Sequence, residues 1–240
     1  MSSRTGTILS RTAPPGLRGA LLTPVLLALV AVCLICAALF AGLGAEVHDA
    51  GTLPTDQRVL HSIDDHTASW PVALPNDVSL IAGEVETAII GLALAVWLFL
   101  RRRWLDALLF VGAVGGYGVL TLLVKQVMAR ERPIAFFRVP ESGYGFPSGH
   151  TMGATCLAFA LGFLLWRSTA RPGLKSLGTV ALVVGVAAIA LSRLILGVHY
   201  PTDVLGSILL GTAWMSGLIA LRFAVERWLV LRTTDAPRTV

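Results

Sequence analysis

Charge is what this sequence has least of. Only 14% of its 240 residues are Asp, Glu, Lys or Arg, and 55% are hydrophobic, whereas about a quarter of the residues in a soluble domain are charged. Several stretches of roughly 20 residues, the length that crosses a bilayer as a helix, carry almost no charge. This scarcity excludes an ordinary soluble globular protein and predicts an integral membrane protein with the lipid bilayer as a partner.

Cysteine is also scarce. The three cysteines, Cys33, Cys36 and Cys156, all lie in apolar stretches, with neither a disulfide pattern nor a Cys/His spacing typical of a metal site. We expect them to pack as small apolar residues, and we expect no metal and no other cofactor. The formal net charge of +5 would suggest nucleic acid as a partner in a soluble protein, but membrane proteins concentrate Lys and Arg in cytoplasmic loops. No nucleic-acid partner is therefore expected.

Six apolar stretches predict an all-α bundle of six transmembrane helices. They are approximately Ala20–Leu43, Ala82–Leu100, Leu105–Val124, His150–Trp166, Leu177–Leu196 and Asp203–Ala224. They form one six-span domain over residues 20–228. Residues 1–19 are expected to be a disordered cytoplasmic tail, and residues 229–240 a second cytoplasmic tail whose part from Thr233 on is expected to be disordered. Between the first two spans, Thr55 and Asp56 are expected to cap a short amphipathic helix at the membrane interface, with Val59, Leu60 and Ile63 on its apolar side.

The basic residues predict the orientation of the bundle. With six spans, both termini and the 2–3 and 4–5 loops share one side, which holds 13 of the 19 Lys and Arg residues, including the run Arg101–Arg103. The other side holds six. Because cytoplasmic loops are enriched in basic residues, we expect a multi-pass plasma-membrane protein with both termini in the cytoplasm and the 1–2, 3–4 and 5–6 loops outside.

Three polar motifs stand where spans meet the predicted outer face. The first is KQVMARERP, in which Lys125 and Arg132 are seven residues apart. The second is PSGH, with Ser148, Gly149 and His150 opening the fourth span, and the third is SRLILGVHYPTD. That third motif supplies Arg193, His199 and Asp203. Since all three motifs fall on one predicted face, we expect them to converge.

The charges in these motifs are typical of a phosphate site. A basic residue within a span costs about 2.5–3.5 kcal/mol on insertion scales, so it needs a partner or a purpose. Lys125, Arg132 and Arg193 together suit a dianionic phosphate. Ser148 and Gly149 open a helix whose N–H groups and dipole favour an anion, and glycine lets that backbone approach closely.

Two histidines add the means for phosphoryl transfer. Asp203 lies four residues after His199 and is expected to fix the ring tautomer, leaving the other ring nitrogen as a nucleophile. His150, beside the Ser-Gly amides, is placed to protonate a leaving oxygen. The pattern predicts a phosphohistidine intermediate formed without a metal ion, because the basic residues neutralise the phosphate charge.

The three motifs together resemble the signature of the type 2 phosphatidic acid phosphatase superfamily, the membrane lipid phosphatases related to vanadium haloperoxidases and glucose-6-phosphatase. Every signature position is matched between Lys125 and Asp203. The resemblance implies phosphate binding by Lys125, Arg132 and Arg193 with Ser148 and Gly149 assisting, a general acid at His150, and a nucleophile at His199 oriented by Asp203.

Several alternatives stay open at this stage. The substrate is expected to be a lipid phosphate or pyrophosphate, such as phosphatidic acid, diacylglycerol pyrophosphate, phosphatidylglycerol phosphate or undecaprenyl pyrophosphate. A phosphotransferase would use the same intermediate, an anion or lipid transporter would use the charges alone, and a vanadate-binding, halide-oxidising role is disfavoured by the six spans. Glu84 and Glu86 either pair with the basic cluster or mark the interface, whereas Arg130, Glu131 and Arg138 are interpreted as solvated loop charges. The oligomeric state is left open.

Overall fold

The structure is a computed structural model that describes residues 15–81 and 83–234. In chain order its long helices are α1 (Pro15–His48), α4 (Glu84–Leu100), α5 (Trp104–Met128), α6 (Gly149–Arg167), α7 (Pro172–Ile195) and α8 (Pro201–Thr234). The shorter helices are α2 (Leu53–Thr67), α3 (Ala73–Ile81) and η2 (Ile134–Phe136). Within the described residues, six segments are long and apolar enough to cross a membrane, the second comprising α3 and α4. No strand occurs in the described part of the chain, so the predicted all-α fold with six spans is confirmed.

Local sequence signals explain several helix ends. Pro172 and Pro201 are each the first residue of a helix, where the missing N–H is tolerated and the fixed φ of proline suits the first turn. α5 ends where Ala129 takes a left-handed φ of 43° and donates its N–H to the carbonyl of Lys125. Many large apolar side chains on the long helices are exposed, as expected for helices that face lipid on one side.

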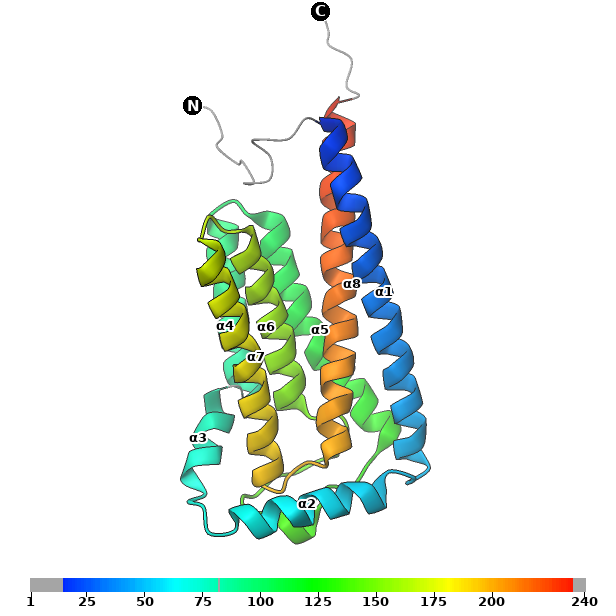
Figure 1. The fold of residues 1–240 in the computed structure, drawn as a ribbon, viewed down its shortest axis with the longest axis vertical. Coiled ribbons are helices and arrows are strands. Elements are labelled where there is room, and N and C mark those ends of the chain that lie inside the picture. The colour runs from blue at the N-terminus through cyan, green and yellow to red at the C-terminus, as the bar shows by residue number, and fades with distance from the viewer. Residues whose placement is uncertain (1–14, 82, 235–240) are drawn as a thin grey trace, which may run out of the picture.

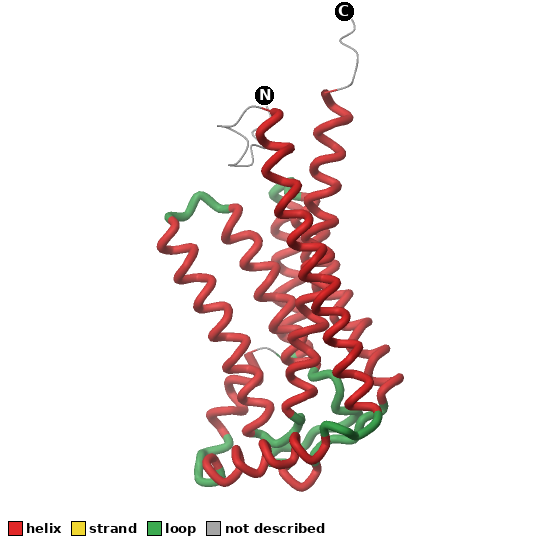
Figure 2. Tube along the Cα trace, turned by 45° about the vertical axis from the view of Figure 1, so that its right-hand side comes forward, coloured by secondary structure: helices red, strands yellow, loops and turns green. Residues whose placement is uncertain are grey.

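The core lies where α4, α5, α6 and α8 meet. Its buried side chains include Leu98, Phe110, Met152, Phe163 and Met215. α1 packs along α8, and α7 packs against α6 (Figures 1 and 2). α6 contacts α4, α5, α7 and α8, so the helix that opens with the PSGH motif is the central one of the bundle.

The two ends of the bundle differ. At one end α2 lies across the ends of the long helices, next to the α5–α6 and α7–α8 connections (Figure 1). α1 begins and α8 ends at the opposite end, which also holds the α4–α5 and α6–α7 connections (Figure 1). The connections that carry the three polar motifs therefore lie at the α2 end.

The amphipathic helix is present as α2, but its predicted start is wrong. α2 begins at Leu53, before Thr55, and Asp56 lies in its first turn. The side chain of Asp56 is buried and bonds to Arg130 and Thr202, so it does not cap the helix. Local spacing predicts a cap, whereas the carboxylate binds residues from distant segments instead.

The helical segments extend into both predicted tails. α1 starts at Pro15 and α8 ends at Thr234, so residues 15–19 and 229–234 are helical. Residues 1–14 and 235–240, the remainder of the predicted tails, lie outside the described residues.

Candidate functional site

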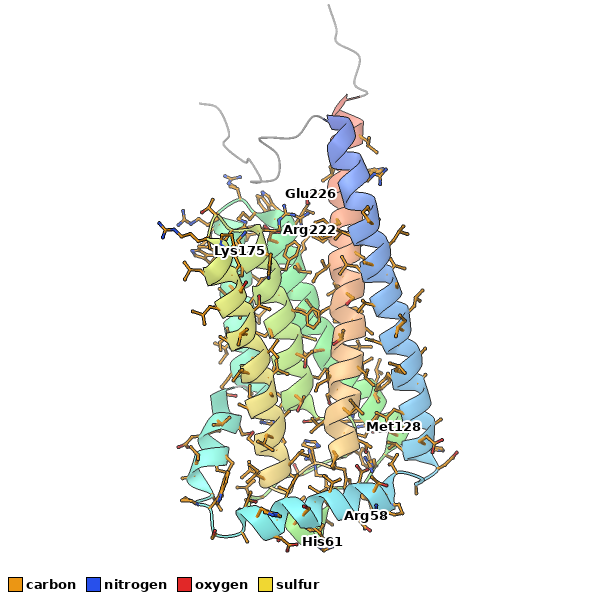
Figure 3. All side chains as sticks on the ribbon, viewed as in Figure 1. Arg58, His61, Met128, Lys175, Arg222 and Glu226 are labelled. Atoms are coloured by element: carbon orange, nitrogen blue, oxygen red, sulfur yellow. The ribbon has the colours of Figure 1, made fainter. Side chains whose placement is uncertain are left out.

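The three polar motifs converge at the α2 end of the bundle. Their residues come from the last turn of α5 (Lys125), the α5–α6 connection (Arg132), the start of α6 (Ser148, Gly149, His150), the last turn of α7 (Arg193), the α7–α8 connection (His199) and the first turn of α8 (Asp203). In Figure 3 this is the end at which His61 and Met128 are labelled, far from Arg222 and Glu226. The order of the helices thus brings the three motifs together at one end of the bundle, as predicted.

His199 and Asp203 form a buried pair. Their exposed fractions are 1% and 0%. Nδ1 of His199 lies 3.5 Å from Oδ2 of Asp203, which is longer than a strong hydrogen bond. The same Oδ2 accepts the backbone N–H of Tyr200 at 2.8 Å. The carboxylate is therefore held at the start of its own helix and faces the ring.

Arg132 reaches the other ring nitrogen of His199. Its Nη1 lies 3.1 Å from Nε2 of the ring and donates to the carbonyl of Val198 at 2.9 Å, while its Nε donates to the carbonyl of Gly143 at 2.9 Å. A guanidinium has donors only, so Nε2 accepts and the ring proton is on Nδ1, toward Asp203. The network selects the tautomer whose lone pair is on Nε2.

Burial also sets the charge of the ring. It lowers the pKa of His199 from 6.5 to about 4, against the opposing effect of Asp203 and with a further lowering by Arg132 and Arg193. The ring is therefore neutral at neutral pH, the form in which an imidazole is nucleophilic.

Arg193 and Arg132 share a carboxylate that the sequence did not reveal. Nη2 of Arg193 donates to Oε2 of Glu141 at 2.5 Å and Nη1 donates to the hydroxyl of Ser79 on α3 at 2.6 Å. Nη2 of Arg132 lies 3.7 Å from Oε1 of the same glutamate. Burial by itself would raise the pKa of Glu141, but Arg193 and Arg132 hold it below its ordinary range. An ionised carboxylate thus bridges two of the three predicted phosphate-binding cations.

The third cation also has an acidic partner. Nζ of Lys125 lies 3.7 Å from Oε1 of Glu84, at the start of α4. From the sequence, Glu84 and Glu86 are each expected either to pair with the basic cluster or to mark the interface. Glu84 pairs with the cluster through Lys125, while Glu86 is exposed.

The PSGH motif begins α6, with Ser148 immediately before Gly149. The N–H of Ser148 donates to the carbonyl of Asp203 at 3.2 Å, so this amide is engaged within the protein. Its hydroxyl accepts from Thr151 at 3.1 Å. A phosphate at this helix start would meet the Ser148 hydroxyl and the amides of the first turn, beginning with Gly149 and the half-buried His150.

Sequence reasoning missed Arg130, and its assignment as a solvated charge is wrong. Its side chain is 10% exposed and donates from Nη1 to Oδ1 of Asp203 at 2.5 Å and from Nη2 to Oδ2 of Asp56 at 2.6 Å. Arg138 is bonded as well, to the carboxylate of Asp64 and the carbonyl of Thr67 on α2. No local signal points to these contacts, since Asp56 lies 74 residues from Arg130.

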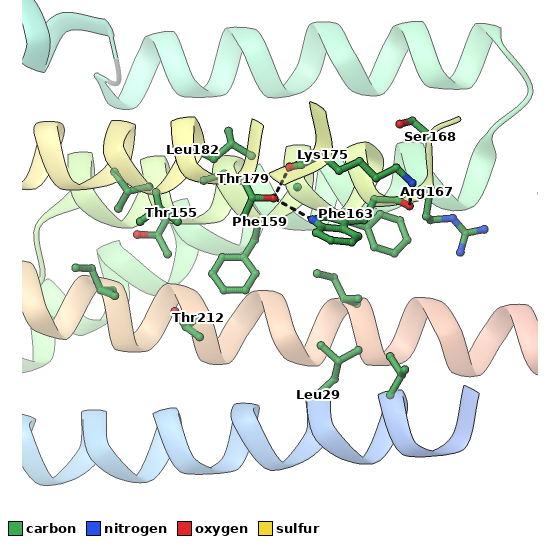
Figure 4. Close-up of a pocket in the computed structure, with 18 of the residues that line it drawn as sticks. Leu29, Thr155, Phe159, Phe163, Arg167, Ser168, Lys175, Thr179, Leu182 and Thr212 are labelled. Atoms are coloured by element: carbon green, nitrogen blue, oxygen red, sulfur yellow. Dashed lines mark hydrogen bonds between the residues drawn. The ribbon is translucent and has the colours of Figure 1, made fainter. Parts of the chain in front are cut away.

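A large apolar cavity lies away from these residues. It measures about 1090 Å³ and is lined by α1, α6, α7 and α8, with Thr155 and Arg167 marking its extent along α6 (Figure 4). None of the eight predicted site residues, all of which the structure describes, lines it. Within the described ranges, no three His, Cys, Asp or Glu side chains gather in a group that could hold a metal ion.

Known proteins similar to this chain are named as lipid phosphatases. Phosphatidylglycerophosphatase B of Bacillus subtilis is 38% identical over 47% of this chain and 56% of its own length. Lipid A 1-phosphatase of Rhizobium johnstonii is 35% identical over 50% and 49%. Decaprenylphosphoryl-5-phosphoribose phosphatase of Mycobacterium tuberculosis is 37% identical over 46% and 56%. The matched region thus spans about half the length of these curated relatives.

A solved structure shares the fold. The crystal structure of a transmembrane PAP2-type phosphatidylglycerolphosphate phosphatase from Bacillus subtilis matches with a TM-score of 0.72 at 24% identity, over 82% of this chain and 98% of that one. A family model described as the PAP2 superfamily matches residues 104–227, a range that contains all three motifs. Since that match covers more than half of the chain, the protein belongs to the PAP2 superfamily.

Proposed function

We propose that this protein removes phosphate from a phosphorylated membrane lipid through a phosphohistidine at His199, without a metal ion. The observation that carries the proposal is the environment of that ring, which is neutral, has its lone pair on Nε2 and lies beside Arg132. A neutral nucleophile among cations suits attack on a dianionic phosphate ester. The names of the relatives support a lipid phosphate as the substrate class.

In the first step the Nε2 lone pair of His199 attacks phosphorus and the bond from phosphorus to the lipid oxygen breaks. His150, as imidazolium, gives its proton to that oxygen, so the lipid leaves as an alcohol, or as a monophosphate when the substrate is a pyrophosphate. The Asp203 carboxylate faces the N–H at Nδ1 of the ring and stabilises the positive charge that develops there. The groups that hold the phosphoryl oxygens are Lys125, Arg132, Ser148, Gly149 and Arg193.

In the second step water attacks the phosphohistidine. The now neutral His150 accepts a proton from the water, the P–N bond breaks, and the electron pair returns to Nε2 of His199 as inorganic phosphate forms. Substrate entry requires two changes from the resting arrangement. Nη1 of Arg132 must leave Nε2 of His199, because the attack uses that lone pair, and phosphate can bind Nη2 of Arg193 only after Glu141 releases it.

Phosphate release by the detergent-purified protein tests the proposal. The substrates are phosphatidic acid, diacylglycerol pyrophosphate, phosphatidylglycerol phosphate and undecaprenyl pyrophosphate, each with EDTA present, and His199→Ala is the control. We expect release that survives EDTA and is lost in the variant, together with an acid-labile phosphoenzyme in the wild type. Release that requires an added metal, or that persists in His199→Ala, would overturn the mechanism.

Two other functions use the same residues. A phosphotransferase would pass the phosphoryl group from His199 to an acceptor lipid or sugar, and the assay would then show phosphoenzyme without phosphate release until the acceptor is added. A transporter would move the anion without a covalent step, so His199→Ala would keep transport. The buried His199–Asp203 pair favours covalent chemistry over both binding and transport.

We further propose that the site faces outward from the plasma membrane. The support is the count of basic residues, 13 on the side of the termini against six on the side of the site. Ser69→Cys in the α2–α3 connection and Thr169→Cys in the α6–α7 connection place exposed thiols on opposite ends. In intact cells a membrane-impermeant thiol reagent should label Ser69→Cys alone, and labelling of Thr169→Cys alone would reverse the orientation.

A further inference from the structure

Arg130 connects the amphipathic helix α2 to the carboxylate that faces His199. It lies between two buried carboxylates, Asp56 on α2 and Asp203 on α8, at 2.6 and 2.5 Å. Its Nη1 also donates to the hydroxyl of Thr202 at 2.7 Å, and its guanidinium lies over the ring of Tyr200, 4.5 Å from the centroid. Contacts with four residues hold the guanidinium in one position.

The oxygens of both carboxylates are engaged. In Asp203, Oδ1 accepts from Arg130 and Oδ2 accepts the N–H of Tyr200. In Asp56, Oδ1 accepts the N–H of Thr202 at 3.1 Å, and Oδ2 accepts from Arg130 and from the Thr202 hydroxyl. One guanidinium thus pairs with two carboxylates. The negative charge of Asp56 therefore determines how strongly Arg130 neutralises Asp203.

We infer that Asp56 and Arg130 are positioning residues that set the orientation and the effective charge of Asp203, and through it the basicity of His199. This inference rests on the proposed function only for its catalytic readout. Because the guanidinium offsets part of the Asp203 charge, it limits how strongly the carboxylate stabilises an imidazolium. Burial is the main reason that the ring is neutral, and we expect Asp56 and Arg130 to add to this effect while they hold the Asp203 carboxylate in place.

Other charged groups around His199 act from different positions. The charged or titratable groups near the ring are Arg132 from the α5–α6 connection, Arg193 from α7 and His150 from α6. Further out are Lys125 on α5 and two acidic partners of these cations, Glu141 and Glu84. Of the residues that the structure describes, Arg130 is the one whose charged side chain bonds directly to the Asp203 carboxylate. This separates its effect from that of the phosphate-binding cations.

The two positioning residues should change His199 in opposite directions. Arg130→Gln removes the cation, leaves two carboxylates uncompensated, and should raise the pKa of His199. Asp56→Asn leaves the whole guanidinium charge to Asp203 and should lower it. Since the nucleophile must be neutral, the acid limb of kcat/KM should move to higher pH in Arg130→Gln and to lower pH in Asp56→Asn, by roughly one unit each.

The chain offers a matched control in Arg138. This arginine belongs to the same connection and also bonds α2, through Asp64 and Thr67, at the far end of that helix. We expect Arg130→Gln to lose on the order of 10–100-fold in kcat/KM, Arg130→Lys to recover part of the loss, and Arg138→Gln to keep both rate and pH profile per folded molecule. Equal losses with unshifted profiles in Arg130→Gln and Arg138→Gln would overturn the inference.

A readout independent of turnover separates this inference from the proposed function. The chain has five histidines, so the His199 ring can be followed by NMR of histidine-labelled protein in detergent, with His199→Asn used for assignment. Opposite shifts of its titration in Arg130→Gln and Asp56→Asn are expected even in a protein that hydrolyses no lipid. Shifts in the same direction, or none, would overturn the positioning role whatever the enzyme assay shows.

Discussion

Glu141 occupies the side of Arg193 and Arg132 on which the substrate phosphate is proposed to bind. Arg193 is 3% exposed and Arg132 is 8% exposed, and such buried cations are costly without a counter-ion. The carboxylate therefore stabilises the resting protein and, in the proposed mechanism, competes with the substrate for the arginine it binds.

Glu141→Gln should bind phosphate analogues more tightly, because it removes the competing charge. We expect the Kd for orthovanadate to fall about tenfold, the equivalent of about 1.4 kcal/mol, and the unliganded variant to melt at a lower temperature than wild type. Thermal shift against orthovanadate concentration measures both effects. Glu131→Gln, an exposed acid in the same connection, is the control, and unchanged or weaker binding by Glu141→Gln would contradict the competition.

The pH dependence of the reaction follows from the burial of His199. A histidine in water, with a pKa of about 6.5, would lose its neutral form below that pH, whereas burial lowers the pKa of this ring to about 4. The neutral fraction is therefore complete at pH 7, and it falls as the pH drops through about 4. We expect the acid limb of kcat/KM, corrected for the substrate's own ionisation by 31P NMR, to lie below about pH 5. An acid limb of kcat/KM near pH 6.5 would instead indicate that the His199 ring is exposed to water and would contradict this prediction.

At the scale of the helices, most of the spans were predictable because charge-free length is a local property. The predicted Leu105–Val124 is α5, and His150–Trp166 is α6 nearly residue for residue. The first predicted span, Ala20–Leu43, is shorter than α1, because polar residues such as Glu46 mark the end of the apolar stretch. A helix can continue past the apolar stretch once its backbone hydrogen bonds are formed, so composition marks the span better than it marks the helix.

The partners of the motif residues were not predictable in the same way. The three motifs could be placed on one face because the chain changes side at each span, so that alternate connections lie on the same side of the membrane. Glu141 and Asp56, however, have no periodicity or motif, and each finds its arginine through packing of distant segments, at separations of 52 and 74 residues. Sequence patterns therefore predicted which residues meet at the α2 end of the bundle, but not the acidic residues that pair with the arginines there.

Close packing of α5 on α8 makes a prediction for one glycine. A Cβ built on Gly116 would overlap the indole of Trp214, whose Nε1–H donates to the carbonyl of Gly112 at 3.0 Å. Gly116→Ala must move that ring and should destabilise the protein by about 1–3 kcal/mol. The neighbouring Gly115 has nothing within 4 Å of such a Cβ, so Gly115→Ala is the matched control. Equal melting temperatures for the two variants in detergent would refute the close approach.

Across the whole molecule, charge is concentrated at both ends of the bundle, with different partners at each. At the end opposite the site, Glu226 on α8 accepts from Arg167 on α6 at 3.0 and 3.1 Å and from Arg222 at 2.8 Å. Arg222 also reaches Asp106 on α5 at 3.1 Å. This network ties α5, α6 and α8 together where the cytoplasmic side is proposed, and Figure 3 places it far from α2.

The separation of the two ends predicts that stability and activity can be changed independently. Glu226→Gln leaves two largely buried guanidinium groups with one carboxylate fewer, and it should cost about 2 kcal/mol of stability, seen as a lower melting temperature in detergent. Its kcat/KM per folded molecule should equal that of wild type, because Arg222 and Glu226 lie at the end of the bundle opposite the PSGH motif (Figure 3). Glu141→Gln should also lower the melting temperature, but bound orthovanadate should restore it, because the missing carboxylate lies beside Arg193 and Arg132. If orthovanadate restored Glu226→Gln equally well, or if that variant lost turnover while folded, the two ends would be coupled through α6 and α8, and the bundle would transmit charge changes over its full length.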